Sequence, residues 1–525
     1  MTQRHRTGAA AGGLAAALTA LALLAGGCTE AGGGVRGTPG AAGLRDPYFP
    51  KLGNGGYDVR HYALTLAYDP ASGRLSGTAD ITARATQDLS AFNLDLAGLT
   101  VGTTTVDGVP AAANRAGNEL TLRPREDIRK GAEFRAVVAY EGVPEPLTDP
   151  DGAREGWLRT ADGAVAVGEP AGSMTWFPGN HHPSDKAAYD ITITVPAGLE
   201  ALANGVRTAR RTAPDGRVTS VWHTPEPMAS YLATVTIGHY ETTAERPAGA
   251  LSTPPAEDTP DTPTGSPVGP GPATPARPSR TSPTSPAPLT PPDSPTSPAS
   301  PTGSPGPSVL TAAERPLAAR TAALRAEVPG IVARQERLFG PYPFAAAGAT
   351  VVADGTLDYA LETQTRPVFP LASFDRTTLV HELAHQWFGN SVTPASWRDL
   401  WLNEGFATYA EWLYGEAYEH VPARKRFETA FAQEANWAFP PAEPPTADNL
   451  FDAPVYQRGA MVLHKLRETV GDRTFDEILR GWLAKYRHAN ATTADFTGYA
   501  ESVAGRDLGA LWAVWLYGED RPSAP

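Results

Sequence analysis

Two histidines and a glutamate in the stretch HELAHQWFGN, residues 381–390, have a spacing that suits metal chemistry. On a helix, His381 and His385 present both imidazoles on one side, where a single zinc ion can bind them. Glu382 points about 100° away around the helix, so its carboxylate can reach a water beside the metal without ligating it. The neighbouring residues are largely apolar, which predicts a buried helix rather than two solvated histidines.

A catalytic zinc needs three protein ligands and an open position for water, so the chain should supply one more ligand. Glu404, in WLNEGFATYAEW, follows within the same part of the chain. The intervening stretch ends the first helix at Gly389, turns at Pro394 and starts a second helix that can pack back against the first. We therefore predict that one zinc ion per chain is bound by the two histidines and Glu404.

The elements around these residues fall into three blocks of different composition. Residues 45–246 carry alternating apolar and polar runs such as HYALTLAY and YDITITVP, which predict half-buried β-strands. Residues 247–309 are rich in Pro, Ser and Thr, which predicts a disordered linker that cannot form a core. Residues 310–525 have a mainly helical period, with a short strand region in GATVVADGTLDYALETQ. We expect a multidomain protein in which a β domain precedes a mainly helical α+β domain.

The first residues have the features of an export signal. A basic start precedes the short apolar stretch GLAAALTALALLAGG, so residues 1–27 are predicted to be a signal peptide. Cys28, the only cysteine in the sequence, resembles the lipidated cysteine of a bacterial lipobox, although Ala25 stands where leucine is commonest. We expect residues 28–44 to form a flexible tether, and the protein to be a lipoprotein on the outer face of a bacterial membrane. A secreted protein with an incidental cysteine is the alternative.

Composition narrows the classes of partner. The 525-residue chain has a formal net charge of −13 at pH 7, which argues against nucleic acid as a partner. Its 41% hydrophobic and 19% charged residues are ordinary for a globular protein. These quantities leave a peptide substrate and the oligomeric state open.

Several blocks of this sequence resemble the aminopeptidase N-type gluzincins, a family of zinc metallopeptidases. In the helical part the blocks are HELAHQWFGN, DLWLNEGFATYAEW and VYQRGAMVLHKL, and in the β part they are NLDLAGL, WFPGNHHPSDKA and PMASYLATVTIGHY. The resemblance covers residues 45–243 and 320–520 and does not include the long helical-repeat domain that many members carry. It implies a saddle-shaped N-terminal β domain, here called the saddle domain, followed by a thermolysin-like catalytic domain.

The resemblance also implies roles for individual residues. His381, His385 and Glu404 correspond to the zinc ligands, and Glu382 corresponds to the general base that takes a proton from the attacking water. Tyr456, in VYQRGA, corresponds to the tyrosine that stabilises the oxyanion of the tetrahedral intermediate. The residues alone give little support to this role, and a packed aromatic side chain at the start of a helix is the other interpretation of Tyr456.

The motif that binds the free amine of the substrate departs from the family pattern. The family usually has Gly-x-Met-Glu-Asn on a strand before the zinc helix, whereas this chain has YALET at residues 359–363, where only Glu362 matches the amine-binding residue. A second amine contact, commonly a glutamine in the saddle domain, corresponds to Glu169 in VGEPAG; a solvated loop carboxylate is the other interpretation. Two carboxylates suit an ammonium group, so an aminopeptidase acting on peptides is the favoured function.

Two other functions stay open. A zinc endopeptidase of related fold would not need a free N-terminus, and a non-catalytic, peptide-binding surface lipoprotein would keep only the fold. The HHPSD stretch, with His181 and His182, is expected to position the saddle domain rather than to bind a second metal. His464 and His488 are expected to lie on polar helix faces, without a function.

Overall fold

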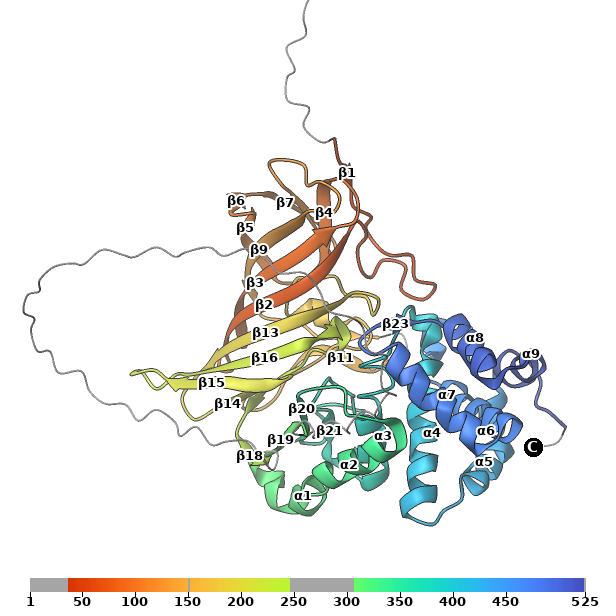
Figure 1. The fold of residues 1–525 in the computed structure, drawn as a ribbon. Helices are drawn as coiled ribbons and strands as arrows, with labels where there is room; N and C mark the ends of the chain where they lie inside the picture. Colours follow the sequence, from red (N-terminus) through yellow and green to blue (C-terminus); the bar gives the residue numbers. More distant parts are fainter. Residues whose placement is uncertain (1–35, 150–151, 246–305, 524–525) are drawn as a thin grey trace, which may run out of the picture.

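The computed structural model describes residues 36–149, 152–245 and 306–523. The predicted signal peptide, Cys28 and most of the predicted linker lie outside these residues. Figure 1 shows β-sheets in the earlier part of the chain and, beside them, a cluster of helices around a small sheet in the later part. This arrangement confirms the predicted order of a β domain followed by a mainly helical α+β domain.

The saddle domain is organised around an eight-stranded sheet. In β2 (Tyr57–Asp69) buried side chains alternate with more exposed ones, which places one face of the strand in the core. Neighbouring strands are antiparallel except for β13 and β2, which are parallel. In spatial order the sheet contains β15 (Val206–Thr212), β16 (Val218–Ala229), β13 (Lys186–Val195), β2 (Tyr57–Asp69), β3 (Arg74–Ala85), β9 (Glu133–Gly142), β5 (Thr100–Val106) and β6 (Val109–Pro110).

Two smaller sheets and two short turns complete the saddle domain. A five-stranded sheet contains β10 (Leu147–Thr148), β11 (Arg154–Arg159), β12 (Ala164–Val167), β17 (Val235–Gly238) and β14 (Glu200–Ala203). A four-stranded sheet contains β1 (Thr38–Pro39), β4 (Leu89–Asp95), β8 (Glu119–Arg123) and β7 (Ala112–Ala116). The turns are η1 (Gly172–Thr175), which follows β12, and η2 (Ser230–Leu232), which follows β16.

The catalytic domain packs helices around another four-stranded sheet. The sheet contains β18 (Tyr240–Glu245), β19 (Ser308–Glu314), β20 (Ala346–Val352) and β21 (Val368–Pro370). A small pair joins β22 (Thr393–Pro394) to β23 (Asn490–Ala491). The helices are α1 (Ala318–Arg325), α2 (Val328–Phe339), α3 (Arg376–Ala384), α4 (Trp401–Tyr418), α5 (Ala423–Ala432), α6 (Gly459–Val470), α7 (Asp472–Lys485), α8 (Thr493–Ala504) and α9 (Gly509–Leu511). Short turns are η3 (Arg315–Leu317), η4 (Leu371–Ser373), η5 (Trp397–Asp399), η6 (Glu434–Trp437), η7 (Ala447–Asn449), η8 (Pro454–Arg458) and η9 (Trp512–Leu516).

Three boundaries differ from those expected from composition. Within the predicted tether, β1 pairs with β4, because its backbone can extend the edge of that sheet. Strand β18 lies in the expected saddle domain but hydrogen-bonds to β19 in the sheet of the catalytic domain. Strand β19 begins inside the predicted linker, at Ser308, and occupies residues 308–314, part of which has helical apolar spacing. Tertiary pairing thus overrides local composition at each end of the insert.

Two histidine expectations are also corrected. His464 is buried on α6, with only 5% of its surface exposed, because the aromatic ring of Phe427 on α5 packs over it at 4.8 Å between ring centroids. His488 lies between α7 and β23 rather than on a helix, and its φ is +60°.

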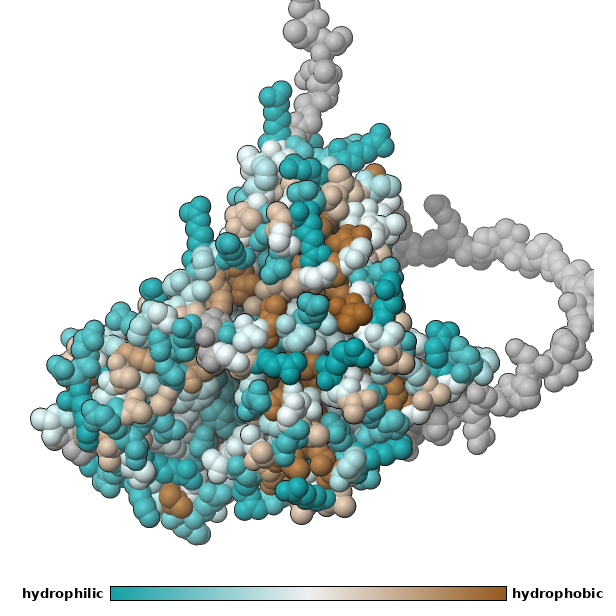
Figure 2. Space-filling model, turned by 180° about the vertical axis from the view of Figure 1, so that it is seen from behind, coloured by the Kyte–Doolittle hydropathy of each residue, from teal (hydrophilic) through white to brown (hydrophobic). Residues whose placement is uncertain are grey.

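The surface in Figure 2 is mainly hydrophilic, and its apolar residues form small separate patches. Among the described residues, large hydrophobic side chains that are exposed are few, namely Val109, Val143, Val514 and Tyr517. In the same part of the chain, every helix is too short or too polar to cross a bilayer.

Candidate active site

Helix α3 carries the two histidines, and its start is fixed by a side-chain cap. The carboxylate of Asp375 accepts a hydrogen bond from the backbone N–H of Thr378 at 3.0 Å, which satisfies a donor of the first turn. The regular helix ends at Ala384, before the predicted end at Gly389, and His385 occupies its C-cap with helical backbone angles. The two imidazoles therefore still lie one turn apart, with ring centroids 4.7 Å from each other.

Each imidazole has one nitrogen committed to a fixed acceptor. The Nδ1–H of His385 donates to the carbonyl of Phe388 at 3.0 Å. The Nδ1–H of His381 donates to Oε1 of Glu411 at 2.8 Å. Because a carbonyl and a carboxylate only accept, these bonds place the proton on Nδ1 and leave Nε2 of both rings as a ligand atom.

Glu404, in the first turn of α4, brings its carboxylate to both of these Nε2 atoms. Its Oε2 lies 3.2 Å from Nε2 of His381 and 3.3 Å from Nε2 of His385. The three ligand atoms lie within 4.8 Å of one another, and two imidazole nitrogens with one carboxylate oxygen form a donor set that suits zinc. The structure thus brings the three predicted ligands together in a site that can hold a zinc ion.

The electrostatics of this cluster also favour a cation. Burial raises the pKa of Glu404, but His385 and His381 lower it more, to about 2. Burial lowers the pKa of His385, but the carboxylates of Glu404 and Glu362 outweigh burial and raise it to about 9. The same negative field attracts a divalent cation, which would displace the imidazole protons on binding.

The zinc-ligand cluster opens into a cavity of about 730 Å³ between the saddle and catalytic domains, a size suited to a peptide or other small molecule. The saddle domain contributes Glu169, and the catalytic domain contributes Glu362 and Glu382 among others. Burial raises the pKa of Glu382 to about 7. Carboxylate oxygens of Glu362 and Glu382 lie within 4.8 Å of each other and of a ring nitrogen of His385, so Glu382 is close to the ligands without being part of the triad.

Glu362 and Glu169 enter this cavity from different domains. Glu362 is held by its backbone carbonyl, which accepts hydrogen bonds from Asn390 Nδ2 at 2.7 Å and Gln386 Nε2 at 3.2 Å. The sequence suggested that Glu362 lies on a strand, but the structure places it outside any regular strand. Only the preceding Leu361 forms an isolated bridge to β21. Glu169 is 5% exposed, so it is not a solvated loop carboxylate. Oε1 of each glutamate is buried and has no hydrogen-bond partner among the described residues.

Tyr456 lines the cavity from η8, a single π-helical turn that leads into α6. Its ring lies nearly parallel to that of His381, with centroids 6.3 Å apart. Burial raises its pKa well above the usual value, and Glu404 adds to this effect, so the phenol keeps its proton. The turn is anchored by buried Arg458, which donates to the carbonyls of Trp515, Phe439, Val514 and Gly518.

Sequence reasoning missed Glu411, the carboxylate that orients His381. A signal for it exists, because Glu411 follows Glu404 by seven residues and so lies on the same face of α4 two turns later. The sequence does not reveal that this face of α4 packs against the Nδ1 side of His381, so the role of Glu411 becomes visible only in the fold.

Comparison with known families places both domains. The Peptidase M1 N-terminal domain matches residues 59–232, and the Peptidase family M1 domain matches residues 374–515. The two matches together span more than half of the sequence and include His381, His385 and Glu404. The chain belongs to peptidase family M1. In this M1 peptidase the catalytic-domain match begins just before α3 and extends beyond Tyr456, so it includes the zinc-ligand cluster and its neighbours.

Relatives of this M1 peptidase differ in how much they share with it. Aminopeptidase N of Streptomyces lividans is 36% identical over 152 residues, which are 26% of this chain and 18% of the relative. Aminopeptidase M1-A of Oryza sativa subsp. japonica is 25% identical over 508 residues, which are 88% of this chain and 50% of the relative. The chain therefore spans half or less of the length of these two relatives.

Solved structures of similar proteins cover this M1 peptidase more completely. The M1 zinc metallopeptidase from Deinococcus radiodurans is 27% identical, with a TM-score of 0.77, and the similarity covers 92% of this chain and 98% of that one. Its E323A mutant bound to a Tyr-Ser-Ala substrate has a TM-score of 0.76 at the same identity, covering 92% and 99%. Another structure of the E323A mutant is described as a two-domain M1 zinc metallopeptidase, the same two-domain arrangement seen in Figure 1.

Proposed function

We propose that this chain is a zinc aminopeptidase that removes N-terminal residues from peptides. The observation that carries the proposal is the pair of buried carboxylates, Glu169 and Glu362, which line the same cavity as the zinc-ligand triad. An oxygen of each has no hydrogen-bond partner among the described residues, and leaving a buried polar atom unpaired is costly. A substrate ammonium would satisfy both. A relative named aminopeptidase N and a solved M1 zinc metallopeptidase structure with a bound tripeptide substrate support this choice.

Burial raises the pKa of both glutamates, and the negative charge of nearby carboxylates adds to the effect at Glu169. An ammonium between Glu169 and Glu362 would therefore favour the charged carboxylates that burial disfavours. A blocked N-terminus offers no such charge, so an N-acetylated peptide should bind poorly. This pair would place the first peptide bond of the substrate beside the zinc ligands.

The remaining residues of the cavity can then act on that bond. A zinc ion held by the two histidines and Glu404 would lower the pKa of water and polarise a carbonyl. Glu382, beside the ligands, would take a proton from the attacking water and pass it to the departing amine. The phenol of Tyr456, which keeps its proton, would donate a hydrogen bond to the developing oxyanion.

Kinetics on matched substrates test this function. We expect the zinc-loaded protein to hydrolyse an aminoacyl arylamide and to leave an N-acetylated peptide nearly intact. Glu362→Gln and Glu169→Gln should each lower kcat/KM for the arylamide by about 10²-fold, as for other buried charge pairs. Glu141→Gln is the control, because Glu141 pairs with Arg74 on the exposed side of β9 and is 53% exposed.

Two results would contradict the proposal. Efficient cleavage of the acetylated peptide by the wild-type protein would favour the endopeptidase alternative. Absence of hydrolysis of both substrates, with zinc bound, would favour the non-catalytic, peptide-binding lipoprotein.

We also propose that the protein is exported and held on the outer face of a bacterial membrane through a lipid on Cys28. The apolar stretch before Cys28 and its place near a lipobox-like sequence support this proposal. In a bacterial host, wild-type protein should fractionate with membranes and incorporate labelled palmitate, whereas Cys28→Ala should do neither. Wild-type protein found entirely in the medium would favour simple secretion.

A further inference from the structure

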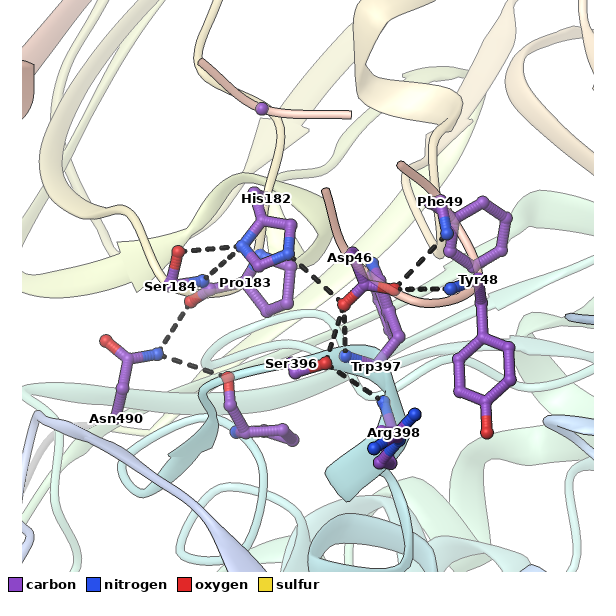
Figure 3. Close-up of polar contacts among 12 residues, drawn as sticks. Asp46, Tyr48, Phe49, His182, Pro183, Ser184, Ser396, Trp397, Arg398 and Asn490 are labelled. Atoms are coloured by element: carbon purple, nitrogen blue, oxygen red, sulfur yellow. Dashed lines mark hydrogen bonds and ion pairs between the residues drawn. The ribbon is translucent and has the colours of Figure 1, made fainter. Parts of the chain in front are cut away.

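A buried aspartate outside the active site joins three parts of the molecule. Asp46, 4% exposed, precedes β2 and lies where the saddle and catalytic domains meet (Figure 3). Its Oδ1 accepts from the N–H groups of Tyr48 and Phe49, at 2.9 and 3.2 Å, which closes a local turn. Its Oδ2 faces His182 of the saddle domain and Ser396 of the catalytic domain. One carboxylate thus spans the junction.

The contacts of Oδ2 suit a charged carboxylate. Oδ2 accepts from Ser396 Oγ at 2.7 Å and from the backbone N–H of Trp397 at 3.0 Å. His182 Nδ1 accepts from the N–H of Ser184, so its Nε2 carries the proton and faces Oδ2 at 3.4 Å. Burial raises the pKa of Asp46, but hydrogen bonds from His182, Ser396 and backbone groups outweigh burial and lower it. Both ring nitrogens of His182 are therefore engaged, which agrees with the expected positioning role of the HHPSD stretch.

The catalytic-domain side of this contact leads directly to a zinc ligand. Ser396 caps η5, because its Oγ accepts from the N–H of Arg398, and η5 continues into α4. Glu404 lies in the first turn of α4. Asp46 therefore holds the residue that caps η5, the turn that leads into the helix of Glu404.

Aromatic packing joins Trp397, in η5, to the N-terminal segment and to the saddle domain. The ring of Trp397 meets that of Phe49 at 6.0 Å and that of Tyr231 in the saddle domain at 5.2 Å, both edge to face. The hydroxyl of Tyr231 accepts from Nδ2 of Asn403, the residue before Glu404, at 3.3 Å. The buried ring of Trp397 is thus fixed by both the N-terminal segment and the saddle domain.

A second contact joins the N-terminal segment that contains Asp46 to the side of the cavity that carries Tyr456. The hydroxyl of Tyr48 donates to the carbonyl of Pro444 at 2.7 Å, in the stretch that leads to η8 and Tyr456. The segment is closed on itself by a hydrogen bond from Leu44 N–H to the carbonyl of Leu52. At its end, Asn54 N–H donates to Asn180 Oδ1 of the saddle domain at 2.6 Å.

We propose that residues 44–54 form an interdomain clasp, and that Asp46 is a positioning residue that sets the placement of Glu169 relative to Glu362. The proposal rests on the aminopeptidase function proposed above, because an ammonium must be reached from both domains at once. Asp46 touches neither substrate nor metal, so its effect is on the geometry between the two carboxylates.

Other contacts across the junction make Asp46 testable without separating the domains. Lys186 Nζ donates to the carbonyls of Asn390 and Ser391, at 3.0 and 2.9 Å. Asn490 Nδ2 donates to the carbonyls of Pro183 and Pro394, and Figure 3 shows this side chain beside Pro183 and Ser184. These bonds remain in Asp46→Asn, whose amide cannot accept from Ser396 and Trp397 while also accepting from its own turn.

Steady-state kinetics of Asp46→Asn test the clasp. We expect one zinc per chain, kcat within about twofold of wild type, and KM for an aminoacyl arylamide raised on the order of 10-fold. Ser396→Ala should raise KM in the same direction by a smaller factor. Asp80→Asn is the control, because Asp80 pairs with Arg135 on the large sheet, away from the junction. In a Glu169→Gln background, Asp46→Asn should raise KM no further, since Asp46 is proposed to act on KM only by placing the carboxylate of Glu169.

A readout that does not need activity separates this proposal from the function it rests on. In Asp46→Asn, the amides of residues 397–404 should exchange hydrogen faster than in wild type. The clasp would be overturned if Asp46→Asn left the exchange of these amides or the KM unchanged. It would also be overturned if Asp46→Asn raised KM by the same factor in the wild-type and in the Glu169→Gln background. Loss of zinc from Asp46→Asn would also overturn it, because Asp46 would then support the metal site. An inactive wild-type protein would instead refute the aminopeptidase proposal, while the exchange data still test the clasp.

Discussion

Gly405 on α4 and Gly459 on α6 meet backbone to backbone. A Cβ atom added to Gly405 would lie 2.9 Å from Cα of Gly459, and one added to Gly459 would lie 2.9 Å from Cα of Gly405. Glu404 immediately precedes the first glycine, and the turn that carries Tyr456 immediately precedes the second. The close approach of these two helices therefore fixes the position of Tyr456 relative to the zinc-ligand cluster.

Gly405→Ala should disturb this relationship. Because backbone rather than a flexible side chain opposes the new methyl group, α4 and α6 must move apart, at a cost of about 1–3 kcal/mol in the free energy of unfolding. We expect kcat to fall as well, since Tyr456 moves with α6. Gly498→Ala is a matched control: Gly498 lies in α8 with nothing within 4 Å of its added Cβ, and the same change there should stabilise the protein. Urea unfolding showing equal effects at both sites would contradict this account.

The hydrogen bond from His381 to Glu411 should control zinc affinity. Glu411→Gln keeps the size of the side chain but removes the charge that holds the Nδ1 proton, so zinc should bind about 10- to 100-fold more weakly. Competition with a chromophoric chelator measures this constant. Glu416→Gln, on the same helix in an ion pair with Arg467, should bind zinc as wild type does. An unchanged constant in Glu411→Gln would mean that this bond does not orient the ligand.

Metal binding and chemistry should separate at two residues of the cavity. Glu382→Gln should keep the zinc and lose activity by about 10²- to 10⁴-fold, because a general base is gone. Tyr456→Phe should keep the zinc and lose about 10²- to 10³-fold in kcat through the lost oxyanion donor. Metal analysis and kcat on the same samples check both. Near-normal rates in either variant would remove that residue from the mechanism.

The zinc ligands were predictable because their signal is local. His381 and His385 are one helical turn apart, and Glu404 follows on the next helix of that part of the chain. Asp46 had no such signal: its partner Ser396 is 350 residues away, so only the folded chain brings them together. His464 was placed wrongly because the charged residues Lys465, Arg467 and Glu468 follow it on α6. The ring of Phe427, on a different helix, packs over His464 and buries it.

The burial of His464 should make the protein sensitive to acid. Burial lowers the pKa of His464 to about 4, below the usual value of a histidine in an unfolded chain. The unfolded state therefore binds more protons between pH 6.5 and 4, and stability falls as the pH falls through that range. Nearby Glu468 favours the charged form, but burial outweighs it, so the loss over this range is on the order of 2–3 kcal/mol. His464→Phe should lose less stability than wild type between pH 7 and pH 4.5; equal losses would assign the acid sensitivity elsewhere.

The long insert should be dispensable, because its two ends are neighbours in one sheet. Strands β18 and β19 are antiparallel, and Glu245 pairs with Val309 across them. Replacing residues 247–306 by Asn-Gly leaves a connection of hairpin length between these partners. Shortening the loop also reduces the entropy lost on closing it, so the free energy of unfolding should rise by about 1–2 kcal/mol.

The rate of arylamide hydrolysis should stay within about twofold, since the cavity lies on other elements. A variant with the insert sequence scrambled at constant composition should behave as wild type. Loss of soluble protein on replacement, with the scrambled variant intact, would show that the length of the insert supports the fold.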